Sequence, residues 1–233
     1  MTAEFFRTYK NVFDNSTIRS LWYLITHHKF EGLESPIKIG KESNVFSALT
    51  KENKRLAVKI YRISVCDFFK MAKYLSMDRR FRFTNNRKQI VLIWAQREFK
   101  NLMRAYENKV SVPQPIAIKD NVLVMKFIGA EHPGFPQAAK MLKDSPGDEK
   151  MMKLVIAEMK KLYRAGLVHG DLSEFNILNF NGKPVLIDLS HSVTLLSPSS
   201  NELLERDVEK ICNFFCKKGF KLTKEDVLKE IKS

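Results

Sequence analysis

The spacing of apolar residues changes along the chain, and this change limits the folds that the sequence can adopt. Between residues 36 and 63, apolar and polar residues alternate as on half-buried β-strands, and Val and Ile are frequent. After residue 148, apolar residues recur every three or four positions, as on helices that cover a core. Strands in the first half and helices in the second predict an α+β protein, with a small β-rich lobe ahead of a helical lobe.

Three parts are expected along the 233 residues. Residues 1–35 are predicted to form an N-terminal helical extension, residues 36–127 the β-rich lobe and residues 128–233 the helical lobe. A segment rich in Arg and Lys, residues 62–90, interrupts the β-rich lobe and is expected to be flexible apart from a short helix. The main helices are expected at residues 14–30, 86–107, 148–165, 201–217 and 223–232.

The charge of the chain favours polyanionic partners. There are 40 Lys and Arg residues against 26 Asp and Glu, a formal net charge of +14 at pH 7. Nucleic acid, nucleotide phosphates and an anionic membrane surface would all suit such a chain. No run of apolar residues is long enough to span a membrane, and the first residues do not resemble a secretory signal. An odd count of three cysteines favours a reducing compartment, so we expect a cytoplasmic protein, with a monomer favoured.

Polar residues interrupt an apolar run at "LVHGDLSEFNILNF", residues 167–180. Asp171 and Asn176 lie in this loop, and Asp188 follows a predicted hairpin that turns at Asn181 and Gly182. Because a hairpin returns the chain to its start, the three side chains are expected to converge. Carboxylate and amide oxygens suit Mg²⁺, and an acid that stays off the metal could orient a hydroxyl or water.

Two further features lie upstream of this loop. Lys59 is a lone charge in the apolar strand "LAVKIY", and it is either a solvent-facing lysine or a cation in a cleft paired with Glu98. A polar turn precedes that strand and could place backbone N–H groups and a hydroxyl against phosphates. The residues of this turn are Gly40, Lys41, Ser43 and Asn44.

Taken in order, these motifs resemble the protein-kinase superfamily, and more closely the type-one branch of the RIO family of atypical serine/threonine kinases in a minimal, archaeal-like form. "HGDLSEFN" together with "IDLSHSV" carries the resemblance most specifically, because "HGD…N" alone is shared with aminoglycoside and choline kinases. The other supporting segments are "GKESNVF", "LAVKIYR", "IVLIWAQREFKNL", "VPQPI…NVLVMKFIG". The resemblance implies a two-lobed kinase-like fold with a truncated helical lobe that lacks an activation segment and peptide-docking helices.

The resemblance also implies roles for single residues, with ATP and Mg²⁺ (or Mn²⁺) as cofactors. Asp171 would be the catalytic aspartate, and Asn176 and Asp188 would hold the metal. Lys59 would complete the catalytic set by binding the α- and β-phosphates, steadied by Glu98. Further nucleotide contacts would come from the turn residues Gly40, Lys41, Ser43 and Asn44, from Val45, Ala57, Met125 and Leu178, and from the main chain of Lys126 and Ile128.

Family members act in maturation of the small ribosomal subunit, and some appear to turn over ATP through a phosphorylated metal-site aspartate, here Asp188. The expected function is therefore an ATP- and Mg²⁺-dependent kinase or ATPase that acts on precursors of the small subunit, with residues 62–90 contacting rRNA. Two alternatives stay open. One is a small-molecule phosphotransferase related to aminoglycoside or choline kinases, and the other is an RNA-binding assembly factor that uses ATP as a conformational ligand.

Overall fold

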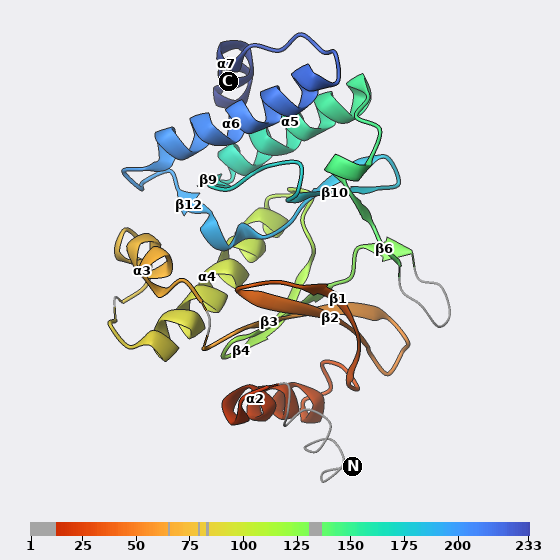
Figure 1. The fold of residues 1–233 in the computed structure, drawn as a ribbon, viewed down its shortest axis with the longest axis vertical. Coiled ribbons are helices and arrows are strands. Elements are labelled where there is room, and N and C mark those ends of the chain that lie inside the picture. The colour runs from red at the N-terminus through yellow and green to blue at the C-terminus, as the bar shows by residue number, and fades with distance from the viewer. Residues whose placement is uncertain (1–12, 65, 79, 83, 131–136) are drawn as a thin grey trace. The chain divides into compact units, whose positions relative to one another are not determined.

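The structure is a computed structural model that describes residues 13–233 except 65, 79, 83 and 131–136 (Figure 1). The chain divides into two compact units, and the change at residues 127 and 128 coincides with the boundary expected from the sequence. Two stretches expected in the β-rich lobe, Lys73–Arg82 and Lys100–Gln114, group instead with the second unit. The first unit therefore consists of residues up to Ala72, Phe83–Phe99 and Pro115–Phe127, and the second contains the rest.

All the expected helices are present, and several short strands add to those expected. The helices are α2 (Asn15–Thr26), α3 (Phe68–Ser76), α4 (Arg87–Glu107), α5 (Glu149–Arg164), α6 (Ser200–Lys217) and α7 (Lys224–Lys232), with short 3-10 helices η1 (Leu142–Asp144) and η2 (Leu189–His191). The strands are β1 (Leu33–Ile39), β2 (Ser43–Leu49), β3 (Arg55–Tyr61), β4 (Pro115–Lys119), β5 (Val122–Lys126), β6 (Gly129–Ala130), β7 (Gln137–Ala138), β8 (Lys140–Met141), β9 (Leu167–Val168), β10 (Ile177–Phe180), β11 (Lys183–Leu186) and β12 (Val193–Thr194). Among the described residues, no helix is both long and apolar enough to cross a membrane.

The first unit is built on an antiparallel sheet with the strand order β1-β2-β3-β5-β4. The chain turns back at Gly40 between β1 and β2, where the polar turn was expected. The N–H of Gly40 donates to the carbonyl of Ser43 at 3.0 Å, and a Cβ at Gly40 would lie 2.8 Å from that oxygen. A side chain at this position would therefore clash with the backbone of the turn.

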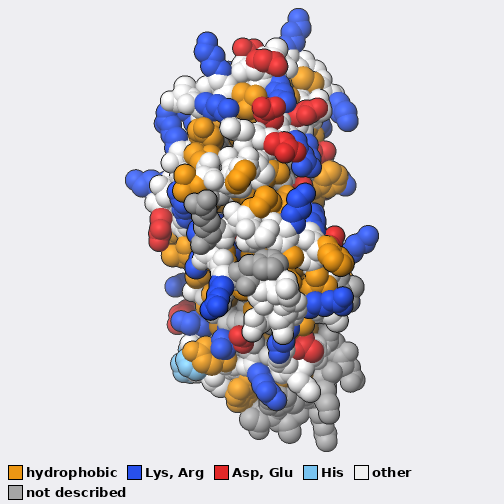
Figure 2. Space-filling view, turned by 90° about the vertical axis from the view of Figure 1, so that its left-hand side faces the viewer, with side chains coloured by type: hydrophobic (Ala, Val, Ile, Leu, Met, Phe, Trp, Pro, Cys, Tyr) orange, Lys and Arg blue, Asp and Glu red, His pale blue; other side chains and the backbone are white. Residues whose placement is uncertain are grey.

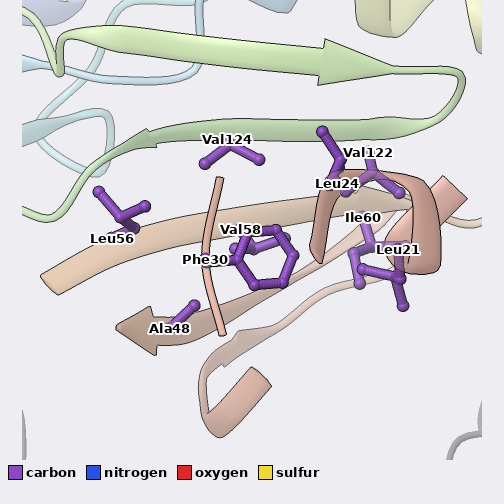
Figure 3. Packing of buried hydrophobic residues seen from close by; sticks show 9 residues of the cluster. All are labelled: Leu21, Leu24, Phe30, Ala48, Leu56, Val58, Ile60, Val122 and Val124. Carbon is purple, nitrogen blue, oxygen red and sulfur yellow. The ribbon is translucent and has the colours of Figure 1, made fainter. Parts of the chain in front are cut away.

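Helix α2 and the following loop cover one face of this sheet. Leu21, Leu24 and Phe30 are almost fully buried in one apolar cluster with residues of the sheet (Figure 3). The sheet contributes Ala48, Leu56, Val58, Ile60, Val122 and Val124. A boundary at residue 35 would therefore divide a single core, so the described part of the expected extension belongs to the sheet unit.

Polar contacts fix the position of α2. The carboxylate of Asp14 accepts hydrogen bonds from the N–H groups of Ser16 and Thr17, which caps the helix. Asn121, in the turn between β4 and β5, donates its side-chain N–H to the Thr17 hydroxyl at 2.9 Å and to the Tyr61 carbonyl at 2.7 Å. One buried amide thus joins the helix, the turn and β3.

The second unit consists mainly of α5, α6 and α7, with α7 in contact with both other helices (Figure 1). Strands β10 and β11 form the predicted hairpin, and β8 extends it to three strands. Its turn residues, Asn181 and Gly182, both have positive φ, as a type I′ turn requires. The hairpin therefore returns the chain from Asn176 towards Asp188.

The basic segment 62–90 contains α3, which confirms the short helix expected there. Arg80 donates to both carboxylate oxygens of Asp78, at 2.8 and 2.7 Å, and to the side-chain oxygen of Asn101 at 2.9 Å. Asn101 in turn donates to the carbonyls of Leu189 and Ser192. Arg80, expected in a flexible stretch, is thus part of a hydrogen-bond network inside the second unit.

Replacing Leu21 tests whether α2 belongs to the core. Leu21→Ala removes a fully buried side chain, so the free energy of unfolding should fall by about 2–5 kcal/mol. Arg19→Ala, on the exposed side of the same helix, should change it by less than about 0.5 kcal/mol. Urea unfolding monitored by circular dichroism measures both, and equal midpoints for the two variants would contradict the shared core.

Candidate active site

A buried ion pair lies at the centre of the first unit. The Lys59 ammonium donates to a carboxylate oxygen of Glu98 at 2.9 Å, and the side chains are only 7% and 1% exposed. The hydroxyl of Tyr61 donates to the other oxygen of Glu98. Lys59 is therefore not a solvent-facing strand lysine, and Glu98 is not a solvated helix residue. Removing either partner would leave a charge buried without its counter-charge, which is strongly destabilising.

The pairing of the strands places several predicted nucleotide residues on one face of the sheet. Lys59 lies opposite Val45 on β2 and Leu123 on β5, and Ala57 lies opposite Met125. Because alternate residues of a strand point to opposite faces, these side chains lie on the face away from α2. The structure thus places four predicted nucleotide-binding side chains on one face of the sheet, although they lie between positions 45 and 125 of the sequence. They are those of Val45, Ala57, Lys59 and Met125.

The predicted phosphate turn lies between β1 and β2. Gly40 and Ser43 close it, and Lys41 is exposed at its tip. The side-chain oxygen of Asn44 is buried and has no hydrogen-bond partner in the part of the chain that the structure describes. A buried acceptor without a donor is costly, so this atom is suited to a ligand or water that can donate.

The remaining predicted adenine contacts belong to both units, with Lys126 in the first and Ile128 and Leu178 in the second. Lys126 ends β5 with an exposed side chain, so only its main chain is suited to a specific contact. The carbonyl of Ile128 accepts a hydrogen bond from the N–H of Ala139 at 3.0 Å. Leu178 lies on β10 between Val185 and Met141.

Hydrogen bonds in the second unit connect Asn176 with Asp171 and with Ile187, the residue before Asp188. The Asn176 side-chain N–H donates to the Asp171 carbonyl at 2.9 Å, so its amide oxygen points away from this bond. The N–H of Ile187 donates to the Asn176 carbonyl at 3.0 Å, which places Asp188 beside Asn176. These two hydrogen bonds bring the backbone at residues 171, 176 and 187 together.

Asp188 has an unusual backbone conformation. Its φ and ψ of 62° and 64° lie in the left-handed region, which is uncommon for a residue with a side chain. The Ser190 hydroxyl donates to one carboxylate oxygen of Asp188 at 2.8 Å and so orients it. One carboxylate and one amide oxygen fit Mg²⁺, which takes few protein ligands and completes its shell with water and phosphate. No cluster of three or more His, Cys, Asp or Glu ligands occurs among the described residues.

A buried carboxylate on α6 holds the loop around Asp171. Asp207 accepts hydrogen bonds from the N–H groups of Gly170 and Leu172, both at 2.8 Å, on either side of Asp171. Burial raises the pKa of the Asp207 carboxyl, whereas nearby His169 and the two N–H donors act in the opposite direction and favour the ionised form.

Sequence reasoning overlooked Asp207 and a second residue of α6, Lys210, whose ammonium donates to a carboxylate oxygen of Asp171 at 2.9 Å. A signal for Asp207 was present in the sequence. At helical spacing it falls in the stripe of Leu203, Leu204, Val208 and Ile211, where an acid needs a buried partner. Lys210 is half-exposed and resembles any other surface lysine in the sequence, so nothing there distinguished it.

Comparison with known proteins agrees with this geometry. Residues 44–228 match the sequence family described as the RIO domain. This range includes the predicted site residues of β2, of β3 and of the loops around Asp171 and Asp188. The chain belongs to the RIO family of atypical kinases. The RIO domain thus covers both the ion pair of the sheet and the loops held by α6.

Relatives of the RIO family from archaea are similar over most of the chain. A RIO-type serine/threonine-protein kinase Rio1 from Methanocaldococcus jannaschii is 41% identical over 97% of this chain and 77% of its own. The protein of the same description from Haloferax volcanii is 39% identical over 93% and 74%, and that from Thermoplasma acidophilum 38% over 81% and 98%. These similarities confirm a kinase of the RIO type.

Solved structures of RIO kinases share the fold. The Rio2 kinase from Chaetomium thermophilum superposes with a TM-score of 0.71 at 23% identity, covering 92% of this chain and 67% of that one. A second structure of that kinase, described as an ADP/Mg²⁺-phosphoaspartate complex, gives 0.69 at 22% identity, covering 92% and 66%. The predicted α+β, kinase-like fold is confirmed.

Replacing Asp207 tests its hold on the loop. Asp207→Ala leaves two buried N–H groups without an acceptor, so the free energy of unfolding should fall by about 2–5 kcal/mol. The amides of Gly170 and Leu172 should also exchange with solvent at least tenfold faster in hydrogen–deuterium exchange. Glu209→Ala, exposed on the same helix, is the control. Unchanged protection of both amides would show that Asp207 does not hold the loop.

Proposed function

We propose that this protein is an ATP- and Mg²⁺-dependent serine/threonine kinase or ATPase of the RIO type, acting on precursors of the small ribosomal subunit. The observation that carries the proposal is the pair of hydrogen bonds that joins Asn176 to Asp171 and to Ile187, the residue before Asp188. Phosphoryl transfer needs a group that positions the nucleophile, a metal site and a cation for the phosphates. The chain has residues of the right chemistry for all three.

Each residue has a distinct part in this proposal. Asp171 accepts a hydrogen bond from the attacking hydroxyl or water and orients it towards the γ-phosphorus. Lys59, whose ammonium is held by Glu98, binds the non-transferred phosphates. Asn176 and Asp188 would hold Mg²⁺, which would supply positive charge for the phosphate oxygens.

Asp188 has a second part in the proposal. The Chaetomium Rio2 complex is described as containing a phosphoaspartate, and the metal-site aspartate of this chain is Asp188. Attack of an Asp188 oxygen on the γ-phosphorus would break the bond to the bridging oxygen, release ADP and leave an acyl phosphate. Water would then hydrolyse this acyl phosphate to inorganic phosphate and restore the carboxylate. The sum is hydrolysis of ATP, in which Ser190 keeps the Asp188 carboxylate oriented.

The charge of the chain supports a ribosomal partner. The face shown in Figure 2 carries many Lys and Arg side chains, dispersed with Asp and Glu between them. In the basic segment, Arg82 and Lys88 are exposed, whereas Arg80 is held by Asp78. We therefore assign rRNA contacts to Arg82 and Lys88, in a protein that works in the cytoplasm as a monomer.

The roles of the two acids predict different effects of their removal. Asp171→Asn should lower ADP production by about 10²- to 10⁴-fold, since a positioned base is lost, while the Kd for Mg-ATP changes less than about threefold. Asp188→Ala should instead abolish the Mg²⁺-dependent part of ATP binding, because it removes a metal ligand. Coupled-enzyme turnover and calorimetric titration measure the two effects.

Asp144→Asn is the matched control for both variants, since Asp144 is an exposed acid of the same unit. The roles are wrongly assigned if Asp171→Asn and Asp188→Ala weaken ATP binding equally. ADP production over many turnovers also excludes an assembly factor that uses ATP only as a conformational ligand.

The RNA contact has its own test. The double variant Arg82→Ala/Lys88→Ala should bind a fragment of small-subunit precursor rRNA more weakly, with a log Kd that depends less steeply on log[salt]. The slope should fall by roughly 0.7–0.9 for each lost phosphate contact. Lys51→Ala/Lys54→Ala removes two exposed lysines from the turn between β2 and β3 and is the control. Filter binding at several KCl concentrations gives the slopes, and an unchanged slope for the first variant rejects these two RNA contacts.

A further inference from the structure

The catalytic-loop aspartate has a cationic partner that is remote in sequence. The Lys210 ammonium lies 2.9 Å from one carboxylate oxygen of Asp171, and 39 residues separate the two. The side chains are 40% and 46% exposed, so solvent reaches both. Exposed ion pairs contribute little to folding stability, because water screens them and ordering two side chains costs entropy. A contribution to stability therefore does not explain this contact.

The surroundings of the pair limit its geometry. Asp207 lies one helical turn before Lys210 on α6, and its carboxylate binds the N–H groups of Gly170 and Leu172. The backbone on both sides of Asp171 is therefore fixed to the same helix that carries Lys210. With backbone and helix held together, the ammonium needs to select only the rotamer of the Asp171 side chain.

We infer that Lys210 is a positioning residue for Asp171, an inference that rests on the proposed function. The ammonium occupies one carboxylate oxygen, which directs the other oxygen to the attacking hydroxyl or water. Ser173, two residues after Asp171, offers only a hydroxyl and no charge for this purpose.

Two replacements of Lys210 distinguish a positioning role from a structural role. Lys210→Met keeps the length of the side chain and removes the charge, so kcat for ADP production should fall by about 10- to 100-fold, a part of the effect of losing the base itself. The KM for ATP should stay within about twofold. Lys210→Arg restores a cation and should recover most of the turnover. The melting temperature of each variant should stay within about 2 °C of the original chain, as for the control Lys217→Met, an exposed lysine of the same helix.

A double-mutant cycle decides whether Lys210 acts through Asp171. If it does, Lys210→Met added to Asp171→Asn should slow turnover by less than twofold beyond Asp171→Asn alone. The inference would be overturned if the two substitutions slowed turnover by the product of their separate effects. It would also be overturned if Lys210→Met left kcat unchanged in an active protein. Both outcomes would leave the proposed function intact. If the original chain shows no ADP production above that of Asp188→Ala, the proposed function fails, and the role of Lys210 fails with it.

Discussion

The carboxylate of Asp207 makes the interactions on which the geometry of the loop around Asp171 depends. It is almost completely buried, so its solvation by water is lost, and two N–H groups at 2.8 Å replace that solvation. Charge-assisted hydrogen bonds of this kind are stronger than neutral ones and specific in direction. Because the two donors lie on either side of Asp171, a single group on α6 determines where that residue is presented. The loop therefore gains its shape from a helix that begins 29 residues after it.

The sheet of the first unit serves two purposes through the alternation of its strands. Along β3, Leu56, Val58 and Ile60 point into the core with α2, and Ala57 and Lys59 point to the other face. The buried pair of Lys59 with Glu98 is costly to desolvate, and Tyr61 offsets part of this cost by donating to the second oxygen of Glu98. The apolar core and the buried ion pair thus occupy adjacent residues of one strand. A slip of register by one position would exchange them and lose both.

Local patterns in the sequence predicted the helices and the hairpin. The contacts that they did not predict join residues that are distant in the sequence. The hairpin at Asn181 and Gly182 followed from turn chemistry, which needs only neighbouring residues. The amphipathic pattern of α2 showed that it buries one face, but not that its partner is the sheet. The hydrogen bonds of Asp207 and Lys210 span 35 to 39 residues, and those of Arg80 reach Asn101, so no local window contains both partners. The pairing of Lys59 with Glu98 came from order along the chain and from family resemblance, not from periodicity.

Gly170 places the two acidic loops in direct backbone contact. Its φ is +79°, and a Cβ at this position would lie 2.6 Å from the carbonyl oxygen of His191, three residues after Asp188. Together with the bond from Ile187 to Asn176, this contact joins the chain before the hairpin to the chain after it. Any side chain introduced at position 170 would push these backbones apart and displace Asp171 and Asp188 in one step. The backbone positions of Asp171 and Asp188 are therefore coupled through Gly170, although the two residues are 17 positions apart in the sequence.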